Sequence, residues 1–461
     1  AWELFTWLSQ EGEDVNALIA RHIQRVNDHL KARGVKLVIW HDMLLAPELE
    51  KLGLTSLSRD LEMPLVEVLA HMENVGIAID TPYLEELSKD FEKRLTNIER
   101  ECYVAAGHEF TINSPKQLGT VIFDELGLQP PGARKTKGGA RSTAVDVLEE
   151  LAPLHPLPRL VLDYRHLSKL KSTYIDALPT LADKEGRVHT SFRQAVSTGR
   201  LASNDPNVQN IPIRTEEGRK IRRAFIAPEG QRLIVADYSQ IELRILASLC
   251  GDPMLKKAFS EGRDIHRAVA AEVNGVKEKD VDDAMRSHVK AIHFGILYGQ
   301  SAFGLSKALG IGRGEAQAFI DRYFERFPKV REFIDTVHSD AKKNGFVTTM
   351  LGRRRTIPGL HDRNMMRQSA ALRQAFNTVV QGSAADLIKT AMLRIHRAIR
   401  DKGLPFKLLI QVHDELLLES SAKDAKKAAE FLKSEMEHAL KLDVPLVVDV
   451  GIGQNWLDAK G

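Results

Sequence analysis

Two short acidic segments place carboxylates where apolar runs end. Asp237 follows the run Leu233–Ala236, and Asp414 and Glu415 separate two further apolar runs. Such runs predict buried strands, so the first segment predicts a strand with Asp237 at its exit, followed by a helix capped by Ser239. The second predicts a tight hairpin with charge at its tip. Carboxylates on rigid strand ends suit a pair of divalent ions that clamps an in-line phosphoryl transfer. Taken singly, each segment is more simply explained as a helix cap or a solvated turn.

One predicted helix, Asp282–Gly299, carries a mixed stripe of cations and aromatic rings. Arg286, Lys290, Phe294 and Tyr298 recur at every fourth position, so each lies only about 40° from the last around the helix axis. The cations lie nearer the N-terminal end, where the helix dipole favours anions, and the rings follow. This order suits a nucleoside triphosphate laid along the helix. The alternative is a core face with a solvated edge, although core stripes rarely place Arg and Lys in register with aromatic rings.

These segments resemble the three motifs of family A DNA polymerases. The stretch from Asp237 to Arg244 resembles motif A, and Val412-His413-Asp414-Glu415 resembles motif C. The spacing Arg286-x3-Lys290-x3-Phe294-Gly295-x2-Tyr298-Gly299 resembles motif B. The likeness extends from Asn113 to the C-terminus and is closest to the polymerase portion of bacterial DNA polymerase I.

The resemblance implies an α+β multidomain fold with the right-hand polymerase architecture: a palm of antiparallel sheet plus helices, helical fingers and a helical thumb. Thr81 with Pro82 predicts the start of a long thumb helix. The expected limits are a remnant of a 3′–5′ exonuclease-like domain without an active site at 1–60, the thumb at 61–187, the first part of the palm at 188–252, the fingers at 253–368 and the second part of the palm at 369–461.

The same resemblance assigns the chemistry. Asp237 and Asp414, with the backbone of Tyr238, would hold two Mg²⁺ ions, for which Mn²⁺ can substitute. Glu415 would be a supporting catalytic carboxylate, and Lys290 would act in catalysis as well as in substrate binding. Template-directed addition of dNTPs to a primer 3′-hydroxyl is therefore the expected reaction.

The resemblance also assigns the contacts to the incoming dNTP. Arg286 and Lys290 would grip the triphosphate, and His266 would add a phosphate contact. Glu242 would lie under the sugar and leave no room for a 2′-hydroxyl. The full set of expected dNTP contacts is Arg286, Lys290, Phe294, Tyr298, His266, Glu242 and Gln240. Phe294 in place of Tyr resembles members that discriminate against dideoxynucleotides.

Primer–template DNA is the second expected partner. Three of its expected contacts, Arg373, Asn377 and Gln381, would read minor-groove acceptors that every correct pair shares, so they test geometry without reading sequence. From the residues alone, ordinary helix-surface polarity explains Asn377 and Gln381 as well. The full set of expected DNA contacts is Arg200, Asn207, Gln209, Arg214, Arg373, Asn377, Gln381 and His413.

Two positions and one short stretch depart from the family pattern. His293 stands where Asn is usual, which bears on fingers closure and not on the chemistry. Leu372 precedes Arg373 where an acidic residue is common, and the stretch 138–141 departs in the expected thumb tip.

Composition sets broader limits. The length of 461 residues predicts two to four domains or subdomains. The sequence contains no stretch of eighteen or more apolar residues, so no membrane span is predicted. The two cysteines, Cys102 and Cys250, indicate a reducing compartment. The net charge is only +3, yet basic residues cluster at 214–223 and 341–375, which suits a phosphate backbone.

The start of the chain carries further expectations. It begins with Ala1 and an amphipathic pattern instead of a signal peptide, which predicts a fragment or processed product. A helix is expected near 15–30 and a strand at 36–39. The expected localisation is the cytoplasm of a bacterial or phage-infected cell, or an organellar matrix, and not secretion.

The expected activity is that of a monomeric DNA-dependent DNA polymerase without proofreading, because the exonuclease carboxylates would lie upstream of Ala1. One alternative is a catalytically inactive DNA-binding scaffold, against which the presence of Asp237, Asp414, Arg286 and Lys290 weighs. Another is a polymerase with reverse-transcriptase activity. Nothing in the sequence excludes an RNA template.

Overall fold

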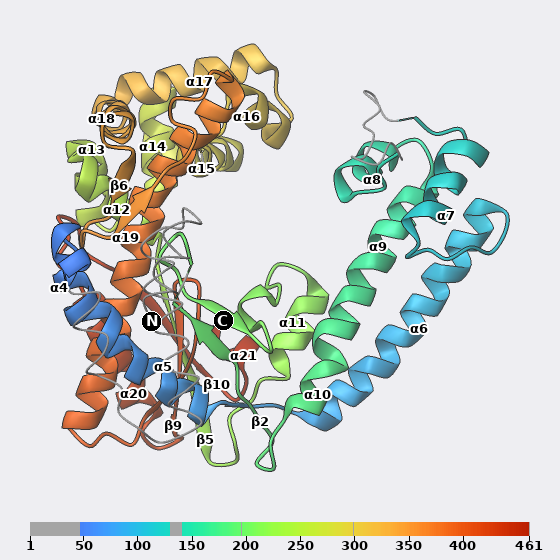
Figure 1. The fold of residues 1–461 in the computed structure, drawn as a ribbon, viewed down its shortest axis with the longest axis horizontal. Helices are drawn as coiled ribbons and strands as arrows, with labels where there is room; N and C mark the ends of the chain where they lie inside the picture. The colour runs from blue at the N-terminus through green and yellow to red at the C-terminus, as the bar shows by residue number, and fades with distance from the viewer. Residues whose placement is uncertain (1–46, 130–140, 195, 298, 461) are drawn as a thin grey trace.

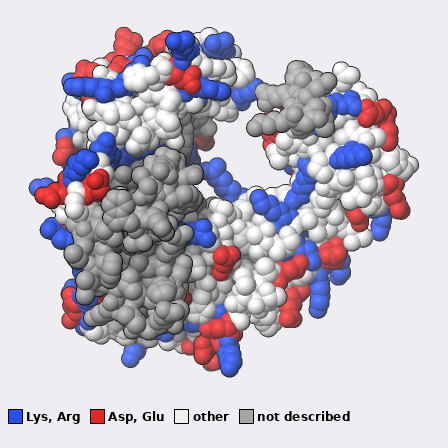
Figure 2. Space-filling view, viewed as in Figure 1, with Lys and Arg blue, Asp and Glu red and all other residues white. Residues whose placement is uncertain are grey.

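The computed structural model describes residues 47–129, 141–194, 196–297 and 299–460, with only the backbone described at 294, 296 and 297. The helix predicted near 15–30, the strand predicted at 36–39 and the loop at 132–140 lie outside these residues. The described chain has a base from which two arms rise, with an open cleft between the arms (Figures 1 and 2). Within these residues no helix is both long and apolar enough to cross a membrane.

A four-stranded antiparallel sheet forms the base, in the order β10-β5-β9-β8. The predicted strand ending near Asp237 and the predicted hairpin around Asp414 are both confirmed. Successive residues of a strand point to opposite faces, so Tyr238 contacts one covering helix, α20, while Asp237 faces another, α21. The elements are β5 (Gln231–Tyr238), β8 (Lys407–Val412), β9 (Glu415–Ser421), β10 (Val448–Gly453), α20 (Ala425–Glu437) and α21 (Trp456–Lys460).

The remaining elements of the base support this sheet. Helix α19 runs from the second arm down into the base, and α5 packs against both α19 and β8 (Figure 1). The elements are α4 (Thr55–Leu57), a π-helical turn (Ser58–Glu62), α5 (Met63–Val75), β1 (Ile77–Ala78), β2 (Arg187–Val188), β3 (Ser191–Arg193), β4 (Ala202–Asn204), a 3-10 turn (Val208–Asn210), α11 (Glu216–Arg223), α12 (Ile241–Cys250) and α19 (Met365–Asp401).

The first arm consists of a long helix pair with its own small core at the tip. Asp80 caps α6 by accepting a hydrogen bond from the Tyr83 amide, and Gly107 ends the helix in the left-handed region at φ 84°. Helices α6 and α9 pack side by side, and the tip buries a separate apolar cluster around Ile122 and Leu148. The elements are α6 (Thr81–Ala106), α7 (Pro115–Thr120), a π-helical turn (Val121–Glu125), α8 (Val145–Leu151), α9 (Pro156–Leu170), a second π-helical turn (Lys171–Ile175) and α10 (Ala177–Leu181).

The second arm is helical except for one short hairpin. The helix predicted at 282–299 is confirmed as α15. The elements are α13 (Pro253–Ser260), α14 (Ile265–Asn274), a 3-10 turn (Glu278–Asp280), α15 (Asp283–Leu297), α16 (Ala302–Leu309), α17 (Arg313–Arg326), α18 (Pro328–Asn344), β6 (Phe346–Thr348) and β7 (Arg354–Thr356).

Two features of the structure differ from the sequence expectations. Ser239 does not cap the helix after Asp237, because Gln240 adopts a left-handed conformation (φ 54°) and α12 begins at Ile241 without a side-chain cap. The expected boundary between residues 60 and 61 falls inside a continuous helical segment, 55–75, which packs against the base and not against the first arm.

A buried group of four charges joins this N-terminal segment to the second arm and the base. Arg353, in the turn between β6 and β7, pairs with Glu62 and lies 2.7 Å from Asp386 of α19. Lys389 Nζ, fully buried, lies 2.8 Å from Glu62. Burial would raise the pKa of Glu62, but Lys389 and Arg353 outweigh it and lower the pKa to about 2. Arg353 is therefore a structural residue, which corrects the expectation that the whole basic run 341–375 faces a phosphate backbone.

Replacing Glu62 with Gln should destabilise the protein by about 3–5 kcal/mol, because Arg353 and Lys389 would be left buried with one carboxylate between them. Urea denaturation followed by circular dichroism measures this loss. Glu332→Gln is the matched control, because the Lys329–Glu332 pair is exposed and screened by solvent, so its loss should leave the unfolding midpoint close to that of the wild type. Equal unfolding midpoints for Glu62→Gln and Glu332→Gln would show that the buried group contributes nothing specific.

Candidate active site

The base sheet brings the three predicted carboxylates to one edge. Asp237, near the end of β5, is paired in register with Glu415, the first residue of β9. Asp414 lies in the two-residue turn between β8 and β9, where His413 adopts φ 56°. The Tyr238 amide donates a hydrogen bond to the Asp414 carbonyl at 3.2 Å, which fixes this turn against the end of β5. The Tyr238 hydroxyl donates to the Met436 carbonyl on the other face, so only the Tyr238 backbone is available to the site.

The charges of Asp237 and Asp414 are only partly compensated by other side chains. Burial, followed by the charge of Asp237, raises the pKa of Asp414 to about 7. Oδ1 of Asp237 is buried without a hydrogen-bond partner among the described residues. A buried, orphaned carboxylate oxygen beside a second carboxylate is a site that a cation would stabilise.

Glu415 has a different environment, because protein groups already satisfy its carboxylate. Trp456 Nε1 donates to Oε1 at 2.5 Å, Arg222 lies 3.8 Å from the same oxygen, and Lys460 pairs with Oε2. Lys460 Nζ also lies 2.9 Å from Asp237 Oδ2. The sequence analysis did not identify Trp456 or Lys460, since no local pattern connects them to strands more than 40 residues away. Arg222, predicted to face phosphate, is instead buried with its guanidinium 4.0 Å from the Trp456 ring centre.

Helix α15 carries both predicted cations, Arg286 and Lys290. Arg286 Nε lies 2.8 Å from Oδ2 of Asp264, which also caps α14 through the His266 and Arg267 amides. Lys290 is exposed one turn further along. Tyr298 and the side chain of Phe294 lie outside the described residues.

His266 is buried, so it is not a solvent-exposed cation that could bind phosphate through its charge. Its Nδ1 lies 2.9 Å from Nδ1 of His293, so one ring donates an N–H and the other accepts. Burial lowers the pKa of His266 to about 4 and that of His293 to about 3. His293 Nε2 has no partner among the described residues, and its ring meets Tyr323 edge-on. The sequence marked position 293 as unusual, because His stands there in place of Asn. It did not indicate that His266 is the partner of His293.

Residues expected to contact DNA divide into two groups. Gln209 is buried and joins Ser203 to Gln411, and the Asn207 side chain accepts from the Asn210 amide, so both hold the backbone of the base in place. Arg200 Nη2 lies 2.8 Å from Glu242 Oε1. Arg200, a predicted DNA contact, is therefore paired with Glu242, the residue predicted to lie under the dNTP sugar. The exposed residues of the set are Arg214, Arg373 and His413.

Helix α19 carries the remaining predicted DNA contacts on one face. Arg373, Asn377 and Gln381 lie one turn apart and line a surface groove of about 740 Å³ together with Arg355 and Arg367. Asn377 Oδ1 is buried without a partner among the described residues.

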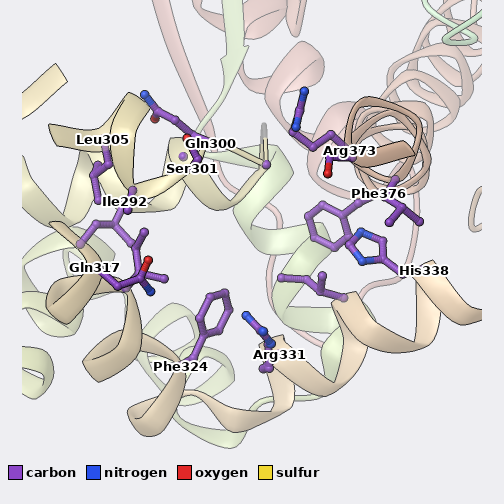
Figure 3. A pocket seen from close by; sticks show the side chains of 17 residues that line it. Ile292, Gln300, Ser301, Leu305, Gln317, Phe324, Arg331, His338, Arg373 and Phe376 are labelled. Carbon is purple, nitrogen blue, oxygen red and sulfur yellow. The ribbon is translucent and has the colours of Figure 1, made fainter. Parts of the chain in front are cut away.

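A second, mostly apolar cavity of about 580 Å³ lies behind α15 (Figure 3). Ile292 and Gly299 line it from α15 and the turn that follows, on the side of the helix away from Arg286 and Lys290. Phe324, His338 and Arg373 close it from α17, α18 and α19.

Comparison with known proteins identifies the family. Residues 81–458 match the model of DNA polymerase family A. The chain belongs to DNA polymerase family A. Its fold is that of a right-hand polymerase, and members of this family use divalent metal ions.

The family A relatives include bacterial DNA polymerases I. The chain is 51% identical over 406 residues to the thermostable DNA polymerase I of Thermus filiformis, covering 88% of this chain and 48% of that protein. It is 47% identical over 424 residues to DNA polymerase I of Pseudomonas aeruginosa, covering 91% and 46%. The chain thus spans about half the length of the curated relatives it matches.

A solved structure has the same fold. The POL domain of Pol1 from M. smegmatis, in complex with DNA primer-template and dNTP, superposes with a TM-score of 0.84 at 42% identity, covering 90% of this chain and 74% of that one.

Replacing His293 with Asn should reduce the sensitivity of the fold to acid. Both histidines have folded-state pKa values below the ordinary 6.5, so the unfolded chain binds more protons and stability falls as pH drops from 6.5 toward 4. Between pH 7.5 and 5.0 His293 alone accounts for a loss of about 2 kcal/mol, which the Asn variant should avoid. Urea unfolding at the two pH values measures the difference. His438→Asn, at an exposed site, should behave as the wild type; equal losses in the wild type and His293→Asn would contradict the buried neutral pair.

Proposed function

We propose that this chain is a template-directed DNA-dependent DNA polymerase, which adds dNTPs to a primer 3′-hydroxyl by two-metal-ion nucleotidyl transfer. The observation that carries the proposal is the convergence of Asp237 and Asp414 at adjoining strand ends. Oδ1 of Asp237 is buried and has no partner in the part of the chain that the structure describes, and burial together with the Asp237 charge raises the pKa of Asp414. Membership of family A and the likeness to a polymerase domain solved with primer-template and dNTP support it.

The donor set suits Mg²⁺, with Mn²⁺ as a substitute. Among the described residues no group of three or more His, Cys, Asp or Glu side chains is placed to hold a metal ion. Asp237, Asp414 and the Tyr238 carbonyl would therefore supply only part of each shell, as is common for Mg²⁺, which keeps waters and binds substrate phosphates. When bound, the two ions would lower the pKa of the primer hydroxyl and neutralise charge on the pyrophosphate.

The protein side chains would position the substrate. Arg286 and Lys290 would bind the triphosphate, for which Arg286 must exchange Asp264 for phosphate oxygens. Lys290, exposed and flexible, would also stabilise the charge that develops on the leaving group. Glu242, with its carboxylate held by Arg200, would occupy the space of a 2′-hydroxyl. Gln240, Phe294 and Tyr298 complete the proposed dNTP contacts, and His266 would offer a neutral N–H instead of a cation to phosphate.

The cleft between the arms is the proposed path of the primer–template duplex. Lysine and arginine side chains occur along its walls (Figure 2), and the groove on α19 contains three arginines beside Asn377 and Gln381. Such a surface binds phosphate backbones with a strong dependence on salt. We assign thumb, fingers and the two palm segments to the ranges 61–187, 253–368, 188–252 and 369–461, except that residues 61–75 pack with the palm. Monomeric action and the bacterial cytoplasm complete the proposal, in keeping with the bacterial relatives.

Extension of a labelled primer on a DNA template, with Mg²⁺ and dNTPs, tests the function directly. Replacing Asp414 with Asn should reduce the rate by about 10³-fold, since removal of a metal ligand costs about 4 kcal/mol of charge stabilisation. Binding of the duplex, measured by fluorescence anisotropy, should change little.

Three comparisons in the same assay separate the alternatives. Tight binding without extension by the wild type would favour an inactive scaffold, and comparable extension on an RNA template would favour a reverse transcriptase. Glu242→Ala should incorporate ribonucleotides more readily than the wild type, whereas Arg200→Gln, which keeps the Glu242 side chain, should not. An unchanged ribonucleotide preference in Glu242→Ala would remove the proposed role of that residue.

A further inference from the structure

Lys460, on the C-terminal helix α21, reaches into the carboxylate site. Its Nζ lies 2.9 Å from Asp237 Oδ2 and also pairs with Glu415 Oε2. The side chain is 26% exposed, so the ammonium bridges the two carboxylates at the boundary between the buried sheet and the cleft.

The position of α21 is fixed by close backbone packing. A Cβ atom added at Gly451 would lie 2.0 Å from the Ala459 carbonyl oxygen, and one at Gly453 would lie 2.4 Å from the Ala459 nitrogen. Only glycines on β10 therefore allow the helix to approach this closely. Trp456 anchors the other end through its fully buried ring and its hydrogen bond to Glu415. Lys460 thus extends from a helix that is held in place, and its flexible side chain is the part that can move.

The charges at the site explain why a cation is held there. Three carboxylates, Asp237, Asp414 and Glu415, gather at one sheet edge. In the described part of the chain, Lys460 and the more distant Arg222 are cations that face them. Lys460 is the one that contacts Asp237, whose other oxygen has no partner among the described residues.

We propose that Lys460 is a tethered counter-cation, which occupies the Asp237 carboxylate when no divalent ion is bound and is displaced from it when an ion binds. The inference rests on the proposed function, because it takes Asp237 as a metal ligand. An ammonium and a divalent cation compete for the same carboxylate oxygens, and the ion, with twice the charge, displaces the side chain toward the cleft. Lys460 then keeps the metal-free site folded and sets the concentration at which metal enters.

Removing this charge should tighten metal binding. In titrations that follow free Mn²⁺ by electron paramagnetic resonance, Lys460→Gln should bind Mn²⁺ about tenfold more tightly than the wild type, equivalent to about 1.4 kcal/mol. Lys460→Arg, which keeps the cation, should remain close to the wild type. The matched control is Lys407→Gln. Lys407 lies 3.4 Å from Glu419, which is on the same strand as Glu415 (β9), and it does not contact Asp237. Equal Mn²⁺ affinity in Lys460→Gln and the wild type would overturn the proposal.

A second measurement needs no variant. Acetylation of the wild-type protein by an amine-reactive ester, read by mass spectrometry, should modify Lys460 faster in saturating Mn²⁺ than without metal, while Lys407 is unaffected. An unchanged rate at Lys460 would contradict displacement. Asp237→Asn separates this inference from the proposed function. If Mn²⁺ binding depends on Asp237 but not on Lys460, only the counter-cation is wrong; if it does not depend on Asp237, the metal site itself is wrong.

Discussion

The repulsion between Asp237 and Asp414 is the constraint around which the site is organised, and the palm sheet enforces it. The register of β5 with β9 places Asp237 beside the turn that carries Asp414, and the hydrogen bond from the Tyr238 amide prevents that turn from moving away. Buried apolar strands on both sides leave little water to screen the two charges. The folded chain therefore maintains a site whose charge is balanced only in part by its own side chains.

Stabilising contacts elsewhere allow the fold to keep this arrangement. Glu415, whose neighbours on β9 are apolar, is neutralised by Lys460, Arg222 and the Trp456 indole, so it supports the sheet edge without adding an unpaired charge. The buried group of Glu62, Arg353, Asp386 and Lys389 joins the base to the second arm near the middle of α19. This helix also carries the proposed minor-groove contacts. The second arm, the base and the segment 55–75 are thus joined by two cations and two carboxylates whose charges balance.

The parts predicted from sequence are those set by local pattern. Apolar runs gave the strands that end at Asp237 and flank Asp414, four-residue spacing gave α15, and the Thr-Pro pair gave the start of α6. The missed features depend on residues far apart in the chain. Lys460 meets Asp237 across 223 positions and Arg353 meets Glu62 across 291, and no period or spacing signals either contact. Ser239 does not act as the cap because Gln240, in a left-handed conformation, is the residue that directly precedes α12.

The most direct test of the account is the position of metal in the assembled complex. Crystals grown with a primer–template whose primer ends in a dideoxynucleotide, the matching dNTP and Mn²⁺ would give an anomalous difference map that locates the ions without assumptions about ligands. The account predicts two manganese peaks between Asp237 and Asp414, with Lys460 Nζ no longer in contact with Asp237. A map with dNTP bound but without manganese beside either aspartate would contradict it.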